Sequence, residues 1–466
     1  MMPFVLAVAV GCSTIHSARD AQREVAAKGA EEVVAAAQDK VALGACSLPE
    51  LVEFALTNRP SMISANLAVT DARLALKQIA ADAPLVSETP WTAPKLSVSG
   101  GHSERSPGST MGDLDLSTEG NPSAALSLEL PVWDFGRNAA AAKAQAERVT
   151  AAELALLNEG YTVFYEVASA YFGVMEKVAL LEVAMTNEME FAVHLQQAQD
   201  MAESGEGVRL DILKAKYDLA AASESRVAAS NALATAEVEM MRALGLEVDG
   251  VDLASFKSLG GASLARTVRG FDSTEYGADA AFALARTNSP TMKMARSRLR
   301  AASHEVDAAV ADLLPSVSLS ASVNWSDPLW AWNWGVSGVQ SLFQGFRKTT
   351  AVDRAVVAMK EAAAGVDDAE QKLSGDIALA VADRDNALEA LVTAETALSR
   401  AKENLDTVAR RFEIGEASRV DYTDAVADYV LELGARVRAF YRGQLAEASL
   451  FTLLGRYPAY HKEETK

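Results

Sequence analysis

The side chains best suited to chemistry are two cysteines and five histidines, and they are dispersed along the 466 residues. None of them stands at the spacing of a metal site or of a nucleophile with its base, and no glycine-rich loop could hold a phosphate. The histidines are His16, His102, His194, His304 and His461. We therefore expect no enzyme, and no metal or other cofactor is predicted.

Cys12 is the one cysteine for which the sequence suggests a reaction. It ends a short apolar stretch of small residues, which resembles the tail of a bacterial lipoprotein signal. Residues 1–11 would then be a leader, and cleavage would leave Cys12 as an acylated N-terminus. No Lys or Arg precedes the stretch, and Ala9 stands where such signals usually carry Leu, so a buried or redundant cysteine is the alternative. Charged residues before Cys46 exclude a second site of this kind.

The six tryptophans all fall in or beside four segments that are predicted to be strands. The predicted strands are residues 95–104, 123–133, 315–326 and 329–340. Because amphipathic aromatic rings gather where a membrane meets water, five of these residues are predicted to form an aromatic girdle. The girdle residues are Trp133, Trp325, Trp330, Trp332 and Trp334.

The predicted strands alternate apolar and polar side chains. Leu126 and Leu128 alternate with Ser127 and Glu129, and residues 316–325 repeat the pattern with valines and serines. Lipid on one face and water on the other would explain it, as would the apolar core of a soluble sandwich. Four strands cannot close a membrane barrel, so the membrane interpretation requires several copies that share one barrel and one axis.

The sequence contains an internal repeat. Residues 55, 57, 58, 60 and 62 recur 230 positions later, and ten residues between 137 and 245 recur 210 positions later. We therefore divide the chain by its repeat. The divisions are an N-terminal extension at 12–47, a first unit at 48–250, a linker at 251–274, a second unit at 275–456 and a tail at 457–466.

Each unit is predicted to be mainly helical. A first helix is expected at 48–82 and again at 276–314, followed by the strand pair and by a long proline-free helix at 138–203 or 348–413. Such a helix is about 100 Å long. Apolar residues within the first of them follow the 4-3 spacing of a coiled-coil seam. They are Phe164, Ala168, Tyr171, Met175 and Val178. Hairpin tips at 204–210 and 414–420 then lead into shorter helices.

The charge and hydropathy of the chain exclude two further classes. A net charge of -20 argues against nucleic acid as a partner, because binding phosphates needs an excess of Lys and Arg. Beyond the N-terminal stretch, no segment has the roughly 18 uncharged apolar residues of a spanning helix.

The order of elements and several motifs resemble the TolC family of outer-membrane efflux proteins. The motifs are residues 130–137 and 341–347, where strand passes into helix, and the tips at 205–211 and 412–424. The resemblance covers nearly the whole chain. It implies a homotrimer with a 12-stranded barrel in the outer membrane of a Gram-negative-type bacterium and a helical tunnel in the periplasm. It also implies a passive channel for efflux or type I secretion, docked to a periplasmic adaptor protein and an inner-membrane transporter.

The resemblance also assigns roles to the tips. Asp211, Asp421 and Asp424 match the acids that close the tunnel, where like charges would repel one another and favour cations. Ala417 stands where the family often has Arg, so Arg419 is the candidate partner of these acids. Asp421 also has a plainer interpretation, because Ser418 three residues earlier could form a helix cap with it. The residues expected to contact the adaptor, or else to form a plain solvated turn, are Gly205, Glu206, Gly207, Val208, Gly415, Glu416 and Ala417.

Two other functions fit parts of the pattern. A trimeric autotransporter adhesin also supplies four strands per chain, but it keeps them together at the C-terminus, whereas these strands form two separated pairs. A soluble coiled-coil scaffold would have the long helices without any contact with lipid.

Overall fold

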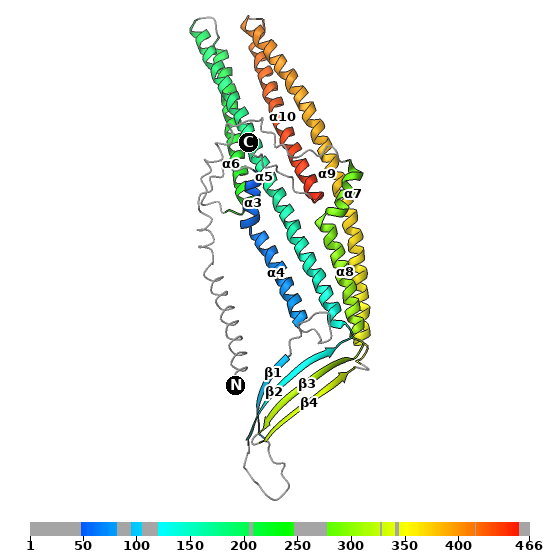
Figure 1. Cartoon of the computed structure of the whole chain (residues 1–466). Helices are drawn as coiled ribbons and strands as arrows, with labels where there is room; N and C mark the ends of the chain where they lie inside the picture. Colours follow the sequence, from blue (N-terminus) through cyan, green and yellow to red (C-terminus); the bar gives the residue numbers. More distant parts are fainter. Residues whose placement is uncertain are drawn as a thin grey trace, which may run out of the picture.

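The computed structural model describes residues 48–81, 95–104, 120–204, 208–246, 277–326, 329–340, 344–414 and 416–455. A sheet lies at one end of an elongated helical bundle, and the two helical tips lie at the other end (Figure 1). None of the described helices is long and apolar enough to cross a membrane.

The two units repeat one order of elements, which confirms the predicted repeat. The first unit contains α3 (Leu48–Asn58), α4 (Pro60–Ala81), β1 (Lys95–Glu104), β2 (Gly120–Trp133), α5 (Arg137–Glu203) and α6 (Arg209–Leu244). The second contains α7 (Ala278–Asn288), α8 (Pro290–Ala311), β3 (Ser316–Ser326), β4 (Leu329–Val339), α9 (Arg347–Glu413) and α10 (Arg419–Leu453). The long helices α5 and α9 each have 67 residues, as the proline-free stretches predicted.

The expectation of one continuous first helix in each unit was wrong. The structure breaks it at Arg59 in the first unit and at Ser289 in the second. The reason is the proline that follows each break, because its ring excludes the helical conformation for the preceding residue. Ser289 accordingly has φ -54° and ψ 127°. The second pair of helices also ends at Ala311, earlier than expected.

In each unit, a glycine at the end of the last helix packs against the break between the first two helices. Gly245 ends α6 with φ 77°, and a Cβ there would lie 3.4 Å from the Cα of Arg59. Gly455 follows α10 with φ 65°, and a Cβ there would lie 3.0 Å from the main-chain oxygen of Asn288. Glycine suits both positions because it has no side chain and accepts a positive φ. The two groups of repeated residues, far apart in sequence, therefore meet in space.

The larger apolar core surrounds α5, which packs on α3, α4, α6, α8 and α10. The predicted seam residues of α5, from Phe164 to Val178, all belong to this core or pack against it, which confirms their interpretation. A smaller core joins α7, α9 and α10 around Ile377, Leu450 and Leu454. The hydroxyl of Tyr161 on α5 donates a hydrogen bond to the main-chain oxygen of Gly455 at 2.7 Å. We call the contact of each glycine with its helix break a glycine joint. The first unit's long helix therefore also stabilises the glycine joint of the second unit, at Gly455 and Ser289.

The sheet is antiparallel with the order β1-β2-β3-β4. The β2–β3 pairing joins the two units, and β1 and β4 are the outer strands. Strand β2 begins at Gly120, three residues before the expected start at 123, and pairs with the whole of β1.

Candidate functional site

The sheet has one apolar face and one polar face, as the alternation predicted. Residues directly opposite in an antiparallel pair share a face, so the register shows which side chains lie together. Two cross-strand rows on the apolar face are Leu96, Leu128, Ala321 and Trp334, followed by Val98, Leu126, Val323 and Trp332. A row on the polar face is Ser97, Ser127, Ser322 and Asn333.

Hydrogen bonds join side chains of neighbouring strands on the polar face, while the side chains of the apolar face are exposed. The hydroxyls of Ser97 and Ser127 are 2.6 Å apart, and that of Ser322 donates to the Asn333 amide oxygen at 2.8 Å. On the other face, Trp332 is 75% exposed and Trp334 69%. Contiguous exposed apolar surface of this kind marks a site that meets lipid or another protein.

Trp133 reaches the apolar face through a β-bulge that the sequence analysis did not detect. Simple alternation from Leu130 would turn Trp133 toward the polar side. The register shifts between Pro131 and Trp133, so that Trp133 lies opposite Val317 on the apolar face. Its ring then contacts Phe135 edge to face, with the centroids 5.9 Å apart. A proline inside a strand was the available signal, since proline tolerates bulges but not regular ladders.

The five predicted girdle residues share the apolar face but not one level of the sheet. Trp325 and Trp330 are opposite one another at the end far from the helices, with ring centroids 6.3 Å apart. Trp133 lies at the end next to the helices, and Trp332 and Trp334 lie between. Their membrane role stays a prediction.

The turn from strand to long helix uses a positive φ in both units. Phe135 and Gly136 have φ 55° and 84°, and Phe346 has φ 62°. The carboxylate of Asp134 accepts hydrogen bonds from the main-chain nitrogens of Gly136 at 3.1 Å and Asn138 at 2.8 Å, so it caps the start of α5.

Asp312, just after α8, joins the starts of both long helices. Its carboxylate lies 3.0 Å from the Arg137 guanidinium at the start of α5 and 3.4 Å from the Lys348 ammonium at the start of α9. One acid therefore couples the two long helices where they leave the sheet.

At the opposite end, Ser418 and Asp421 form the predicted cap of α10. The Ser418 hydroxyl accepts from the Asp421 main-chain nitrogen at 3.2 Å, and the Asp421 carboxylate accepts from the Ser418 main-chain nitrogen at 2.9 Å. Hydrogen bonds from Ser418, with a smaller contribution from Arg411, lower the pKa of Asp421 below its ordinary value. The cap is confirmed, whereas a gating role for Asp421 stays a prediction.

Arg419 joins the two tips through main chain. Its Nη1 donates to the main-chain oxygen of Asp211 at 2.9 Å, so the start of α10 is tied to the start of α6. Its Nη2 is buried and has no hydrogen-bond partner among the described residues. The structure thus brings Arg419 to Asp211, but to the backbone and not to the carboxylate, while Asp421 and Asp424 are exposed.

Of the predicted adaptor-contacting residues, the structure describes three. Val208 and Glu416 are exposed, and Ala417 is half-buried. The main-chain nitrogens of Glu416 and Ala417 donate to the Arg411 oxygen and close the end of α9. The other predicted tip residues and the lipidation candidate lie outside the described residues. They are Gly205, Glu206, Gly207, Gly415 and Cys12.

An aromatic cluster beside the tip was missed in the sequence. The rings of Phe412 and Tyr422 stack with centroids 5.3 Å apart, and the ring of His194 on α5 meets Tyr422 at 4.7 Å. In the sequence, His194 stands at no functional spacing from another histidine or a cysteine. The structure instead places it between α5 and α10, and no local sequence pattern indicates this contact.

A family model supports what the geometry indicates. The model described as outer membrane efflux protein matches residues 51–246 and 282–456, which covers both units. The chain belongs to the outer membrane efflux protein family. This confirms the resemblance inferred from the motifs. It also replaces the adhesin and the soluble scaffold as interpretations.

Three known outer-membrane proteins are similar to this chain over most of its length. The outer membrane efflux protein BepC of Brucella suis is 25% identical over 333 residues, which cover 69% of each chain. The CmeC outer membrane channel of Campylobacter jejuni superposes with a TM-score of 0.72 at 16% identity, over 90% of this chain and 86% of CmeC. VceC of Vibrio cholerae gives 0.69 at 19% identity, over 88% and 96%. The solved structures show the shared fold.

Membership of the outer membrane efflux family settles the location and the general function. The protein is an outer-membrane transport protein whose helical part extends into the periplasm. The family consists of transport channels and not of enzymes. Among the described residues, no group of three or more His, Cys, Asp or Glu side chains is placed to hold a metal ion.

Proposed function

We propose that three copies of this chain form a duct that receives cargo from a periplasmic adaptor and an inner-membrane transporter and conducts it passively outward. The observation that carries the proposal is the unequal burial of equivalent positions in the two units. Equivalent positions of the two units are 210 residues apart, or 230 apart for α4 and α8.

In the helical bundle, the contacts between the two units are made by α5 and not by α9. In the chain, α5 packs on α8 and α10 of the second unit. If the repeat extended to the next copy, α9 would pack in the same way on that copy's α4 and α6. Within one chain α9 packs on α7, α8 and α10 and makes no extensive contact with described residues of α4 or α6. The face of α9 that is equivalent to the α8- and α10-facing side of α5 is therefore available to a neighbouring copy.

Two exposed valines of α6 occupy positions that are buried on α10. Val437 and Ala448 on α10 are 0% exposed. Their equivalents on α6, Val227 and Val238, are 46% and 39% exposed. A second copy that covers α6 as α5 covers α10 would remove this apolar surface from water.

The same difference separates α4 from α8. Ser297 on α8 is 0% exposed, whereas its equivalent on α4, Leu67, is 63% exposed. Exposed Ile63 and Leu74 continue the stripe along α4. Within the chain, Glu147 on α5 forms an ion pair with Arg300 on α8. The position on α9 that is equivalent to Glu147 is exposed Val357, and α9 is the expected partner of the neighbour's α4. An apolar stripe would thus meet an apolar residue between copies.

The sheet supports three copies by its open edges. Strands β1 and β4 each pair on one side within the described chain, and exposed polar main chain is not tolerated in lipid. Three copies supply twelve strands, enough for a closed barrel with the tryptophan face toward lipid and the serine face toward water.

The shared axis would bring three copies of each tip together. We infer that Asp211, Asp421 and Asp424 then line the periplasmic constriction, where converging negative charges favour cations. Arg419 holds the α6 and α10 tips of one chain together, and the exposed residues Val208 and Glu416 are available to the adaptor. Acylation of Cys12 belongs to the same proposal and is tested by the intact mass of the mature chain.

Native mass spectrometry of the full chain in detergent tests the assembly, and we expect three copies. In planar bilayers, replacing both Asp421 and Asp424 with Ala should lower the preference for cations. Asp428→Ala, one turn further along α10, is the matched control and should leave selectivity unchanged. A detergent-solubilised monomer would overturn the duct, and unchanged selectivity in the double variant would overturn the acidic constriction.

A further inference from the structure

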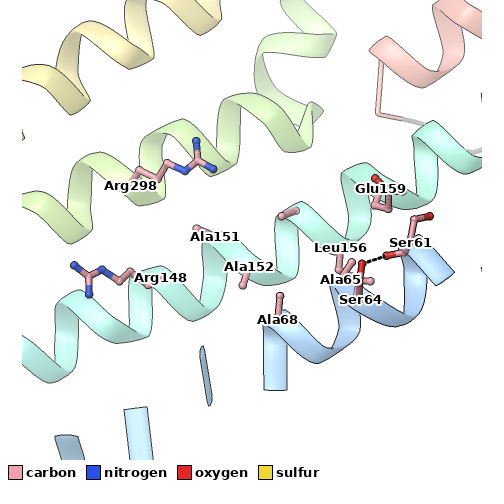
Figure 2. A pocket seen from close by; sticks show the side chains of 11 residues that line it. Ser61, Ser64, Ala65, Ala68, Arg148, Ala151, Ala152, Leu156, Glu159 and Arg298 are labelled. Carbon is pink, nitrogen blue, oxygen red and sulfur yellow. Dashed lines mark hydrogen bonds between the residues drawn. The ribbon is translucent and has the colours of Figure 1, made fainter. Parts of the chain in front are cut away.

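A groove between α4 and α5 is lined by a serine whose hydroxyl has no partner in the part of the chain that the structure describes. The groove has a volume of about 650 Å³ and is lined mainly by alanines, with Ser61, Ser64 and Glu159 at one end and Arg148 at the other (Figure 2). The Ser61 Oγ is buried and has no hydrogen-bond partner among the described residues. Buried hydroxyls normally form a hydrogen bond, so an acceptor from outside the described chain is expected for this atom.

The equivalent groove of the second unit shows where such an acceptor comes from. There Thr291 on α8 stands at the position of Ser61, and its hydroxyl donates to the Asn158 amide oxygen at 3.2 Å. Asn158 lies on α5, and this helix covers the groove between α8 and α9. Thr162 and Tyr165 of the same helix also line the groove. The second unit therefore receives its acceptor from the first unit's long helix.

The position equivalent to Asn158 in the second unit is Asp368, and that equivalent to Thr162 is Lys372. Both lie on α9, where the Lys372 ammonium donates to the Asp368 carboxylate at 2.7 Å. Lys372 is 72% exposed and Asp368 61%. In one chain these residues are remote from Ser61, because α4 and α9 lie on opposite sides of the bundle with α5 and α8 between them (Figure 1).

We propose that Asp368 of a second copy enters the end of the α4–α5 groove and accepts a hydrogen bond from Ser61. Ser61 lines the groove, and the contact would require its buried hydroxyl to rotate toward the incoming carboxylate. The proposal rests on the trimer and adds to it a site that one chain leaves incomplete.

Charge supports the same placement. Lys372 of the second copy would approach Glu159, which forms no ion pair with any residue that the structure describes. Inside the chain, the equivalent positions are Thr162 and Ala369, which are uncharged and both line the second groove. The charged pairing thus exists only between copies, which favours contact of α9 with a neighbour's α4 and α5.

Two chains that carry different tags and one new cysteine each test the contact. Ser61→Cys in one and Asp368→Cys in the other, co-expressed as full chains, should give a doubly tagged dimer with a short thiol-reactive cross-linker. Chains with a single new cysteine report any reaction of Cys12 or Cys46. Asn158→Cys with Thr291→Cys in one chain is the matched control, which should cross-link internally and give no dimer.

A charge reversal sharpens the test. Lys372→Glu should lower the yield of the doubly tagged dimer several-fold, and adding Glu159→Lys in the other chain should restore it. A trimer by native mass with no doubly tagged dimer, while the internal control reacts, overturns this contact and leaves the duct intact. A monomer by native mass overturns both.

Discussion

Helices α5 and α9 have the same length and the same place in their units, yet their surroundings differ. Helix α5 is enclosed by five other helices, whereas α9 packs on three. Phe164 on α5 is 0% exposed, and its equivalent on α9, Ser374, is exposed. Val174 on α5 is buried among apolar residues, and its equivalent Arg384 is also buried but pairs with the more exposed Asp385 at 2.7 Å. Repetition therefore sets the elements, and position in the chain decides which faces are covered.

Truncating the two equivalent positions should break the comparison most visibly. Phe164→Ala removes a fully buried ring and should lower the free energy of unfolding by about 3–5 kcal/mol. Ser374→Ala, at the exposed equivalent, should change it by less than about 0.5 kcal/mol. Urea unfolding in detergent followed by circular dichroism measures both. Equal losses would mean that α5 and α9 are equally covered.

The two glycine joints offer a second comparison. Gly455→Ala should cost about 2–3 kcal/mol, because the new Cβ meets main-chain atoms at 3.0 Å in addition to the positive φ. Gly245→Ala has an ordinary 3.4 Å contact and should cost about 1–2 kcal/mol from its φ alone. Thermal unfolding of the two variants should rank them in this order, and the reverse order would contradict the tighter second joint.

The tips differ in how their second helix begins. Helix α10 has a complete capping box, whereas Val208 at the start of α6 offers no side-chain cap. Ser418→Ala should speed amide hydrogen exchange in the first turn of α10 roughly fivefold and leave the first turn of α6 unchanged. Thr423→Ala, in the same helix but outside the cap, serves as the control.

The cap also has a pH dependence with a defined sign. Because folding lowers the pKa of Asp421 from 3.8, its contribution is present above that value and is lost as pH falls through the lower folded pKa. The protection of the amides in the first turn of α10, relative to the intrinsic exchange rate at each pH, should therefore fall in that acidic range in the parent protein but much less in Asp421→Asn. The same acid response in both proteins would show that Asp421 does not hold this turn.

The sequence predicted what depends on local periodicity. The alternation in the strands and the proline-free stretches gave the sheet faces and the long helices, because both patterns repeat over many residues. Pro60 and Pro290 carried the signal for the helix breaks, and Pro131 carried that for the bulge. Local reading could not place Arg419 against the main chain of Asp211, since that contact depends on the relative height of two tips far apart in sequence.

Asp312 has a mechanical consequence. Because this carboxylate contacts the first turns of both α5 and α9, sliding of one rod past the other at its base would break one of these ion pairs. Bending or swivelling of the rods at this end would keep both ion pairs. In a rod of about 100 Å, a tilt of one degree moves the tip by about 2 Å. A small angular change beside the sheet would therefore be magnified into a larger displacement of the tips.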